Sequence, residues 1–145
     1  MNVLIAVGFS QNPQQFLEDT LKLLHQALDA VWLLHVAEPD PDFVGYGIDP
    51  TVMRDQVAEG FHREHRQLQE MAEALRTQGI AATALLVQGE TVKAIIQQAE
   101  SLNADLIVVG SRKTGLLRHF LSGEQVLGGL RSSGRPVLLM PVSQD

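Results

Sequence analysis

Short apolar runs alternate with longer amphipathic segments along this chain, and that alternation limits its fold more than any other feature. The runs are Asn2–Val7, Val31–Val36, Ile80–Val87, Asp105–Gly110 and Pro136–Val142. Continuous apolar runs of this length are typical of strands that are buried on both faces. Strands separated by helices form a parallel sheet through right-handed crossovers. The pattern therefore predicts an α/β fold, a five-stranded parallel sheet with helices on both faces.

The segments between the runs carry apolar residues at helical spacing. They predict helices at Gln14–Asp29, at Thr51–Gln78, from Thr91 onward, and at Glu124–Ser132. Ser10 or Asn12 can cap the first helix, ahead of Pro13 at its first position, and Thr91 is the expected cap of the third.

The segment Ala37–Pro50 is a long loop with three prolines and two glycines. A loop of this length without secondary structure is uncommon in a compact domain and often covers a site or makes a contact. It is equally compatible with a loop that has no part in function.

Length, charge and composition narrow the class of protein. A chain of 145 residues fits one domain, residues 1–145. A net charge of −6 argues against general nucleic-acid binding, which needs a dense basic surface. No apolar run approaches the roughly 20 residues that span a bilayer, and the start of the chain lacks a charged signal region. With no cysteine, we expect a cytoplasmic domain that binds neither membrane nor nucleic acid.

The stretch from Asp105 to Gln125 contains the strongest candidate for a binding site. An apolar strand ends at Gly110, a basic segment follows, and Gly123 stands just before a predicted helix. A strand tip, a basic loop and a helix start are the parts from which phosphate sites are commonly built. An ordinary strand-to-helix connection would need the same glycines for its turns, so the residues alone leave both interpretations open.

Other chemistry has little support in the sequence. The GxxxxGK[ST] and GxGxxG phosphate-binding patterns are absent, and no serine has a recognisable histidine and acid partner. His62 and His65 lie three residues apart beside Glu64, but no third metal ligand is visible. His35 lies in the predicted strand Val31–Val36, where we expect a hydrogen-bonded or strand-end histidine rather than a metal ligand. The sequence predicts no metal site.

Four segments together resemble the universal stress protein family over nearly the whole chain. They are VLIAVGFS, LLHVAEP, VQGETVKAIIQQAESLNADLIVVGSR and GSRKTGLLRHFLSGEQV…RPVLLMPV. The resemblance implies an adenine nucleotide alpha hydrolase-like sheet of order 3-2-1-4-5, which would bring Val7–Gly8 and Gly110 to one crevice. It also implies a stress-response or signalling homodimer that pairs through the last strand, Val137 to Val142.

Many members of that family bind ATP through a glycine, two residues, a second glycine, nine residues, a third glycine and then Ser or Thr. In this chain Gly110 and Gly123 keep the spacing, while Lys113 replaces the second glycine and Glu124 replaces the hydroxyl residue. A strand-one aspartate of the binders corresponds to Gly8. The resemblance thus implies an altered, weakened site for an adenine nucleotide (ATP, ADP or AMP), with AMP and ADP less penalised than ATP. The expected site residues are Ala6, Val7, Gly8, Val36, Val109, Gly110, Arg112, Lys113, Gly123, Glu124 and Gln125.

Two other functions are compatible with the resemblance. One is a nucleotide-sensing adaptor that regulates an unknown partner protein. The other, less favoured, is a slow ATPase, for which the sequence offers no identifiable base and therefore no catalytic residue.

We expect the substitution Glu124→Ser to strengthen ATP binding in titration calorimetry. A carboxylate at this helix start opposes each phosphate charge by about 1 kcal/mol at ~4 Å in water, and more in a dry site. An unchanged affinity would show that Glu124 points to solvent, with Lys113, Arg112 and Arg118 attracting the phosphates instead.

Overall fold

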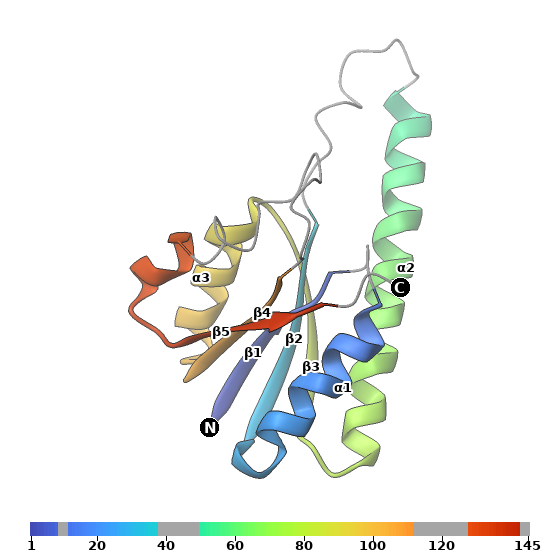
Figure 1. Ribbon diagram of the computed structural model, residues 1–145. Coiled ribbons are helices and arrows are strands. Elements are labelled where there is room, and N and C mark those ends of the chain that lie inside the picture. The colour runs from blue at the N-terminus through green and yellow to red at the C-terminus, as the bar shows by residue number, and fades with distance from the viewer. Residues whose placement is uncertain (9–11, 38–49, 112–127, 143–145) are drawn as a thin grey trace.

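The computed structural model describes residues 1–8, 12–37, 50–111 and 128–142. Its elements alternate along the chain as the sequence predicts (Figure 1). They are β1 (Asn2–Ala6), α1 (Pro13–Leu24), η1 (His25–Ala27), β2 (Ala30–Ala37), α2 (Pro50–Thr77), β3 (Ala82–Gln88), α3 (Thr91–Ser101), β4 (Leu106–Ser111), η3 (Arg131–Ser133) and β5 (Val137–Pro141).

The five strands form one parallel sheet in the order β3-β2-β1-β4-β5, which confirms the predicted fold class and strand order. The central strand β1 has a parallel neighbour on each side. Val3 pairs with Val31 of β2 and with Leu106 of β4. The chain thus moves from β1 toward one edge of the sheet through β2 and β3, and toward the other edge through β4 and β5.

Each face of the sheet has its own hydrophobic core, because α1 and α2 cover one face and α3 covers the other (Figure 1). Ile5 of β1 packs in the first core with Phe16 of α1 and Leu68 of α2. Leu4, its neighbour in the chain, packs in the second core with Ile95 of α3. Successive strand side chains point to opposite faces, so an apolar run is needed to fill both cores.

The N-cap of α1 agrees with the sequence analysis, and the N-cap of α3 differs from it. Asn12 caps α1, since its Oδ1 accepts from the backbone N–H of Gln15 at 3.1 Å. The cap of α3 is Glu90 rather than the expected Thr91. The two carboxylate oxygens of Glu90 accept from the N–H groups of Val92 and Lys93, at 3.1 and 3.2 Å. A carboxylate satisfies two of the free N–H groups and favours the positive end of the helix dipole.

The start of β3 and the end of α1 differ from the predicted boundaries, because apolar residues that were assigned to these elements lie in turns. The strand expected from Ile80 begins at Ala82, since the Ile80 N–H donates to the Leu75 carbonyl at 3.0 Å to close the end of α2. The first helix ends at Leu24 and continues as the 3-10 turn η1.

The predicted long loop and last helix are described only in part. Of the loop, Ala37 belongs to β2 and Pro50 begins α2, while residues 38–49 lie outside the described part of the chain. Of the last helix, residues 128–130 are helical and η3 follows, while residues 124–127 lie outside.

Candidate functional site

The strand order places the ends of β1 and β4 next to each other at the carboxyl edge of the sheet. The chain leaves β1 toward one edge and returns to β4 on the other side, so strand order reverses between these two strands. In open parallel sheets, ligands bind in the crevice at such a point. β1 ends here at Ala6 and is followed by Val7 and Gly8, and Val109 and Gly110 lie near the end of β4.

The side chains of the expected site residues divide between the two cores. Ala6, Val36 and Val109 pack on the α3 face of the sheet, whereas Val7 packs on the face covered by α1 and α2. Since Val7 and Val109 are each only 3% exposed, their side chains belong to the protein interior. A ligand at this edge would therefore meet the main chain of these residues rather than their side chains.

The two glycines of the crevice have different surroundings. A Cβ atom added to Gly8 would have no atom of the described residues within 4 Å, and Gly8 itself is exposed. A Cβ added to Gly110 would lie 2.5 Å from Cγ2 of Val142 and 3.6 Å from Cε2 of Phe16. Packing thus requires a glycine at position 110, while position 8 is open to solvent or to a ligand.

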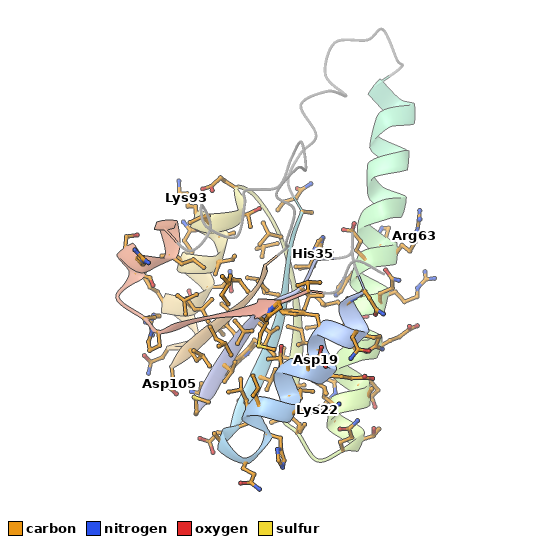
Figure 2. All side chains as sticks on the ribbon, in the orientation of Figure 1. Asp19, Lys22, His35, Arg63, Lys93 and Asp105 are labelled. Atoms are coloured by element: carbon orange, nitrogen blue, oxygen red, sulfur yellow. The ribbon has the colours of Figure 1, made fainter. Side chains whose placement is uncertain are left out.

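His35 connects the end of β1 to helix α2. Its Nδ1 lies 2.7 Å from the Val7 carbonyl oxygen, and its Nε2 lies 3.0 Å from Oε2 of Glu64. The expectation that this strand-end histidine is hydrogen-bonded is confirmed. Sequence reasoning missed the partner, because Glu64 lies in a row of charged residues typical of a solvated helix face. Figure 2 labels His35 near the carboxyl edge of the sheet and shows Arg63 pointing outward from α2.

A second carboxylate stands at the same edge of the sheet. Glu90 follows the end of β3 and binds the first N–H groups of α3. Because the Glu90 carboxylate already accepts from the N–H groups at this helix start, an anionic ligand would gain little binding free energy from them. The positive side chain nearest to it in the chain is Lys93, which is exposed (Figure 2).

The remaining expected site residues, Arg112, Lys113, Gly123, Glu124 and Gln125, lie outside the described part of the chain. Of the expected site residues, the structure brings Ala6–Gly8, Val36 and Val109–Gly110 to one edge of the sheet. Among the described residues, no group of three or more His, Asp or Glu side chains is placed to hold a metal ion.

Comparisons with known proteins identify the class. The model of the universal stress protein family matches residues 1–141, and the chain belongs to that family. A search of the curated proteins gives no match.

Solved structures with the same fold include the hypothetical protein MJ0577, with a TM-score of 0.70 and 20% identity over 99% of this chain and 97% of that one. A universal stress protein in complex with cAMP has a TM-score of 0.63 and 18% identity, over 99% of this chain and 98% of that one. A family member from Arabidopsis thaliana with AMP bound has a TM-score of 0.62 and 19% identity, over 99% of this chain and 92% of that one. Separately, no helix in the described segments has both the length and the apolar character needed to cross a membrane.

We expect Gly110→Ala to lower the free energy of unfolding by about 1–3 kcal/mol, because the new methyl group overlaps Val142. The matched variant Gly8→Ala should cost no more than about 0.5 kcal/mol, because its methyl group meets open space. Urea denaturation of both variants measures the difference.

The double variant Gly110→Ala/Val142→Ala tests the cause. Removing the Val142 methyl groups should restore part of the free energy of unfolding that Gly110→Ala loses. Equal costs at positions 8 and 110 would contradict the assignment of Gly110 to packing.

Proposed function

We propose that this chain is a homodimeric stress-response protein that binds an adenine nucleotide at the carboxyl edge of β1 and β4. The observation that carries the proposal is the open space at Gly8, beside the point where strand order reverses. In open parallel sheets ligands bind beyond the strand ends at such a point, and Gly8 has no side chain there, at the end of the central strand. Two structures of the same fold, one with AMP and one with cAMP, support an adenine nucleotide as the ligand.

A nucleotide with one phosphate suits this chain better than ATP. Lys113 and Glu124 stand where the ATP-binding pattern has a glycine and a hydroxyl residue. A carboxylate at position 124 opposes each added phosphate charge, by about 1 kcal/mol at ~4 Å in water. The cost grows with the number of phosphates, so AMP or cyclic AMP is less penalised than ATP.

The proposed dimer uses β5 (Val137–Pro141). This strand is at one end of the sheet order, so its outer edge has main-chain groups that a second copy can pair with. We place this dimer in the cytoplasm, acting on a protein partner whose identity the residues do not specify. Hydrolysis is not part of the proposal, because no residue of the site is assigned as a general base.

Thermal-shift scans with AMP, cyclic AMP, ADP and ATP test the proposal. A ligand present at about 100 times its Kd should stabilise the fold by about 2.7 kcal/mol, which corresponds to a rise in Tm of roughly 5–10 °C for a domain of this size. We expect the largest rise with AMP or cyclic AMP and the smallest with ATP. GMP at the same concentration is the control for non-specific stabilisation. No shift with any adenine nucleotide at millimolar concentration would contradict the proposed function.

Restoring the family's strand-one aspartate provides a gain-of-function test. Gly8→Asp should be tolerated, since the position is open, and the new carboxylate offers an acceptor for the nucleoside. A hydrogen bond to a charged group contributes about 1.5–3 kcal/mol, so AMP affinity in calorimetry should rise roughly tenfold or more. Gly8→Ala is the matched control, since it adds a side chain without an acceptor, and it should not raise the affinity. A weaker affinity of Gly8→Asp would place the nucleoside away from position 8.

A further inference from the structure

The outer edge of β3 is open to a further strand. β3 is the last strand on its side of the sheet, and in the described part of the chain it pairs with β2 alone. The Val31 N–H donates to the Ala81 carbonyl at 2.8 Å, and the Gly89 N–H donates to the Ala37 carbonyl at 3.2 Å. The odd-numbered residues of this segment therefore direct their main chain toward β2. Because successive residues of a strand alternate, the even-numbered residues direct theirs away from the sheet.

Three residues on this edge have main-chain groups without a partner on the outer side. They are Ala84, Leu86 and Gln88, and nothing in the described segments hydrogen-bonds to them there. Each offers one N–H donor and one carbonyl acceptor. Ala84 and Leu86 are partly exposed and Gln88 is exposed. A row of unpaired main-chain groups of this kind is a template for pairing with another chain.

Arg76 of α2 closes the edge at its amino end. Its Nη1 donates to the outward-pointing carbonyl of Ala82 at 3.0 Å. Glu73 holds the guanidinium in turn, because its Oε2 lies 3.0 Å from Nη2 and 3.2 Å from Nε. Pairing along the edge would therefore stop before Ala82, and the positive charge of Arg76 would stand beside that end of an added strand.

The sequence of β3 lacks the features that protect most natural sheet edges, which are charged residues, prolines and bulges. The strand Ala82–Gln88 has no charged residue and no proline, and all of its residues pair with β2 in unbroken register. The other edge strand, β5, ends at Pro141, which has no N–H to donate. With seven residues against five, β3 presents the longer uninterrupted edge.

Apolar side chains on this strand are incompletely covered. Leu85 and Val87 are partly buried beside the core on the α3 face. Leu86, whose side chain points to the opposite face, is also partly exposed. An added strand with apolar residues would cover these side chains, since cross-strand neighbours on one face of a sheet pack together.

We propose that the β3 edge binds an extended segment of a partner protein, which adds to the sheet as an antiparallel strand. Doubly wound sheets often have an antiparallel edge strand, and antiparallel pairing is slightly more stable per residue. In that orientation the segment begins near Glu90, which is exposed, and ends near Arg76. Charge complementarity then favours a segment with a basic residue at its start, alternating apolar residues in its middle and an acidic residue at its end.

A second copy of this chain is a poorer occupant of the β3 edge. Here the inference rests on the proposed function, in which the second copy pairs with β5. A protomer that paired with further copies at both edges of its sheet would extend without closing, as open filaments do. The occupant is therefore a different protein. In strand addition of this kind, main-chain hydrogen bonds give affinity and the alternate side chains give specificity.

A designed peptide serves as the probe. The peptide Lys-Thr-Val-Thr-Val-Thr-Glu, with blocked ends, carries the charges expected for antiparallel addition, and Glu-Thr-Val-Thr-Val-Thr-Lys reverses them. Fluorescence anisotropy of the labelled peptides measures their affinity without any nucleotide. We expect the first peptide to bind roughly threefold more tightly, as two exposed ion pairs allow. Equal affinities would overturn the antiparallel orientation, and binding of neither peptide at millimolar concentration would overturn the proposal.

Proline variants test the edge itself. Leu86→Pro removes an outward N–H at the middle of the open edge and leaves the hydrogen bonds to β2 in place, because proline is tolerated where the N–H faces solvent. Binding of the first peptide should weaken roughly tenfold, and less in the control Leu86→Ala. Gln88→Pro, with Gln88→Ala as its control, repeats the test at an exposed position. Unchanged affinity in both proline variants, each with a cooperative thermal transition, would overturn the proposal.

Amide hydrogen exchange gives a second readout. In the free protein the N–H groups of Leu85 and Val87 should exchange slowly, because they pair with β2. Those of Ala84, Leu86 and Gln88 should exchange fast and become slower when the first peptide is added. Slow exchange of this second group in the free protein would overturn the proposal. Protection that increases with protein concentration would assign the edge to a second copy and overturn the choice of partner.

Sedimentation separates this inference from the proposed function. Leu86→Pro should leave the proposed dimer intact, because that dimer uses β5. A wild-type monomer that binds the first peptide would overturn the homodimer and support the open β3 edge. A wild-type dimer that dissociates in Leu86→Pro would overturn both the assignment of β5 and this inference.

Discussion

Burial of β1 on both faces is the constraint on which the rest of this structure depends. Leu4 and Ile5 point to opposite sides of the sheet, and neither is exposed to water. A strand of this kind needs helices on both faces, because each apolar side chain must be covered. One crossover leads from β1 to β2 on one side, and the chain returns to β4 on the other side of β1, so strand order reverses between β1 and β4. The candidate site at the carboxyl edge of the sheet follows from this strand order.

The same packing limits what this edge of the sheet can present to a ligand. Val7 and Val109 are used by the two cores, and Gly110 has no room for a side chain beside Val142. What remains at the strand ends is the main chain and the open position at Gly8. In such a site, specificity has to come from the direction of peptide groups and from side chains of the connecting loops.

Two carboxylates at the carboxyl edge of the sheet are bound by hydrogen-bond donors of the protein. Glu90 caps α3 with a carboxylate, and Glu64 binds the ring of His35. Both carboxylates are held by donors of the protein itself, which reduces the cost of placing them near an anionic ligand. The acidic chain as a whole still opposes polyphosphates. A nucleotide with few charges is the ligand that this edge would penalise least.

Sequence alone was sufficient for the alternation of elements, because buried strands and amphipathic helices have different periods of apolar residues. The Asn12 cap with Pro13 was also readable, since a cap depends on residues that are neighbours in the chain. The cap of α3 could not be identified from the sequence. Glu90 and Thr91 can both cap a helix, and the backbone conformation decides which of them does. The adjacency of β1 and β4 came from family resemblance, because strand order depends on contacts between distant segments.

The sequence by itself thus determined the class of fold, the family and the departures at Gly8, Lys113 and Glu124 from the ATP-binding pattern. Tertiary structure decided which glycine is required by packing and which leaves open space, since that depends on Val142 and Phe16, far apart in the chain. It also decided the pairing of His35 with Glu64, 29 residues apart in sequence. Local patterns encode the elements, whereas only the packed chain brings an acid, a ring and a strand end within hydrogen-bonding distance.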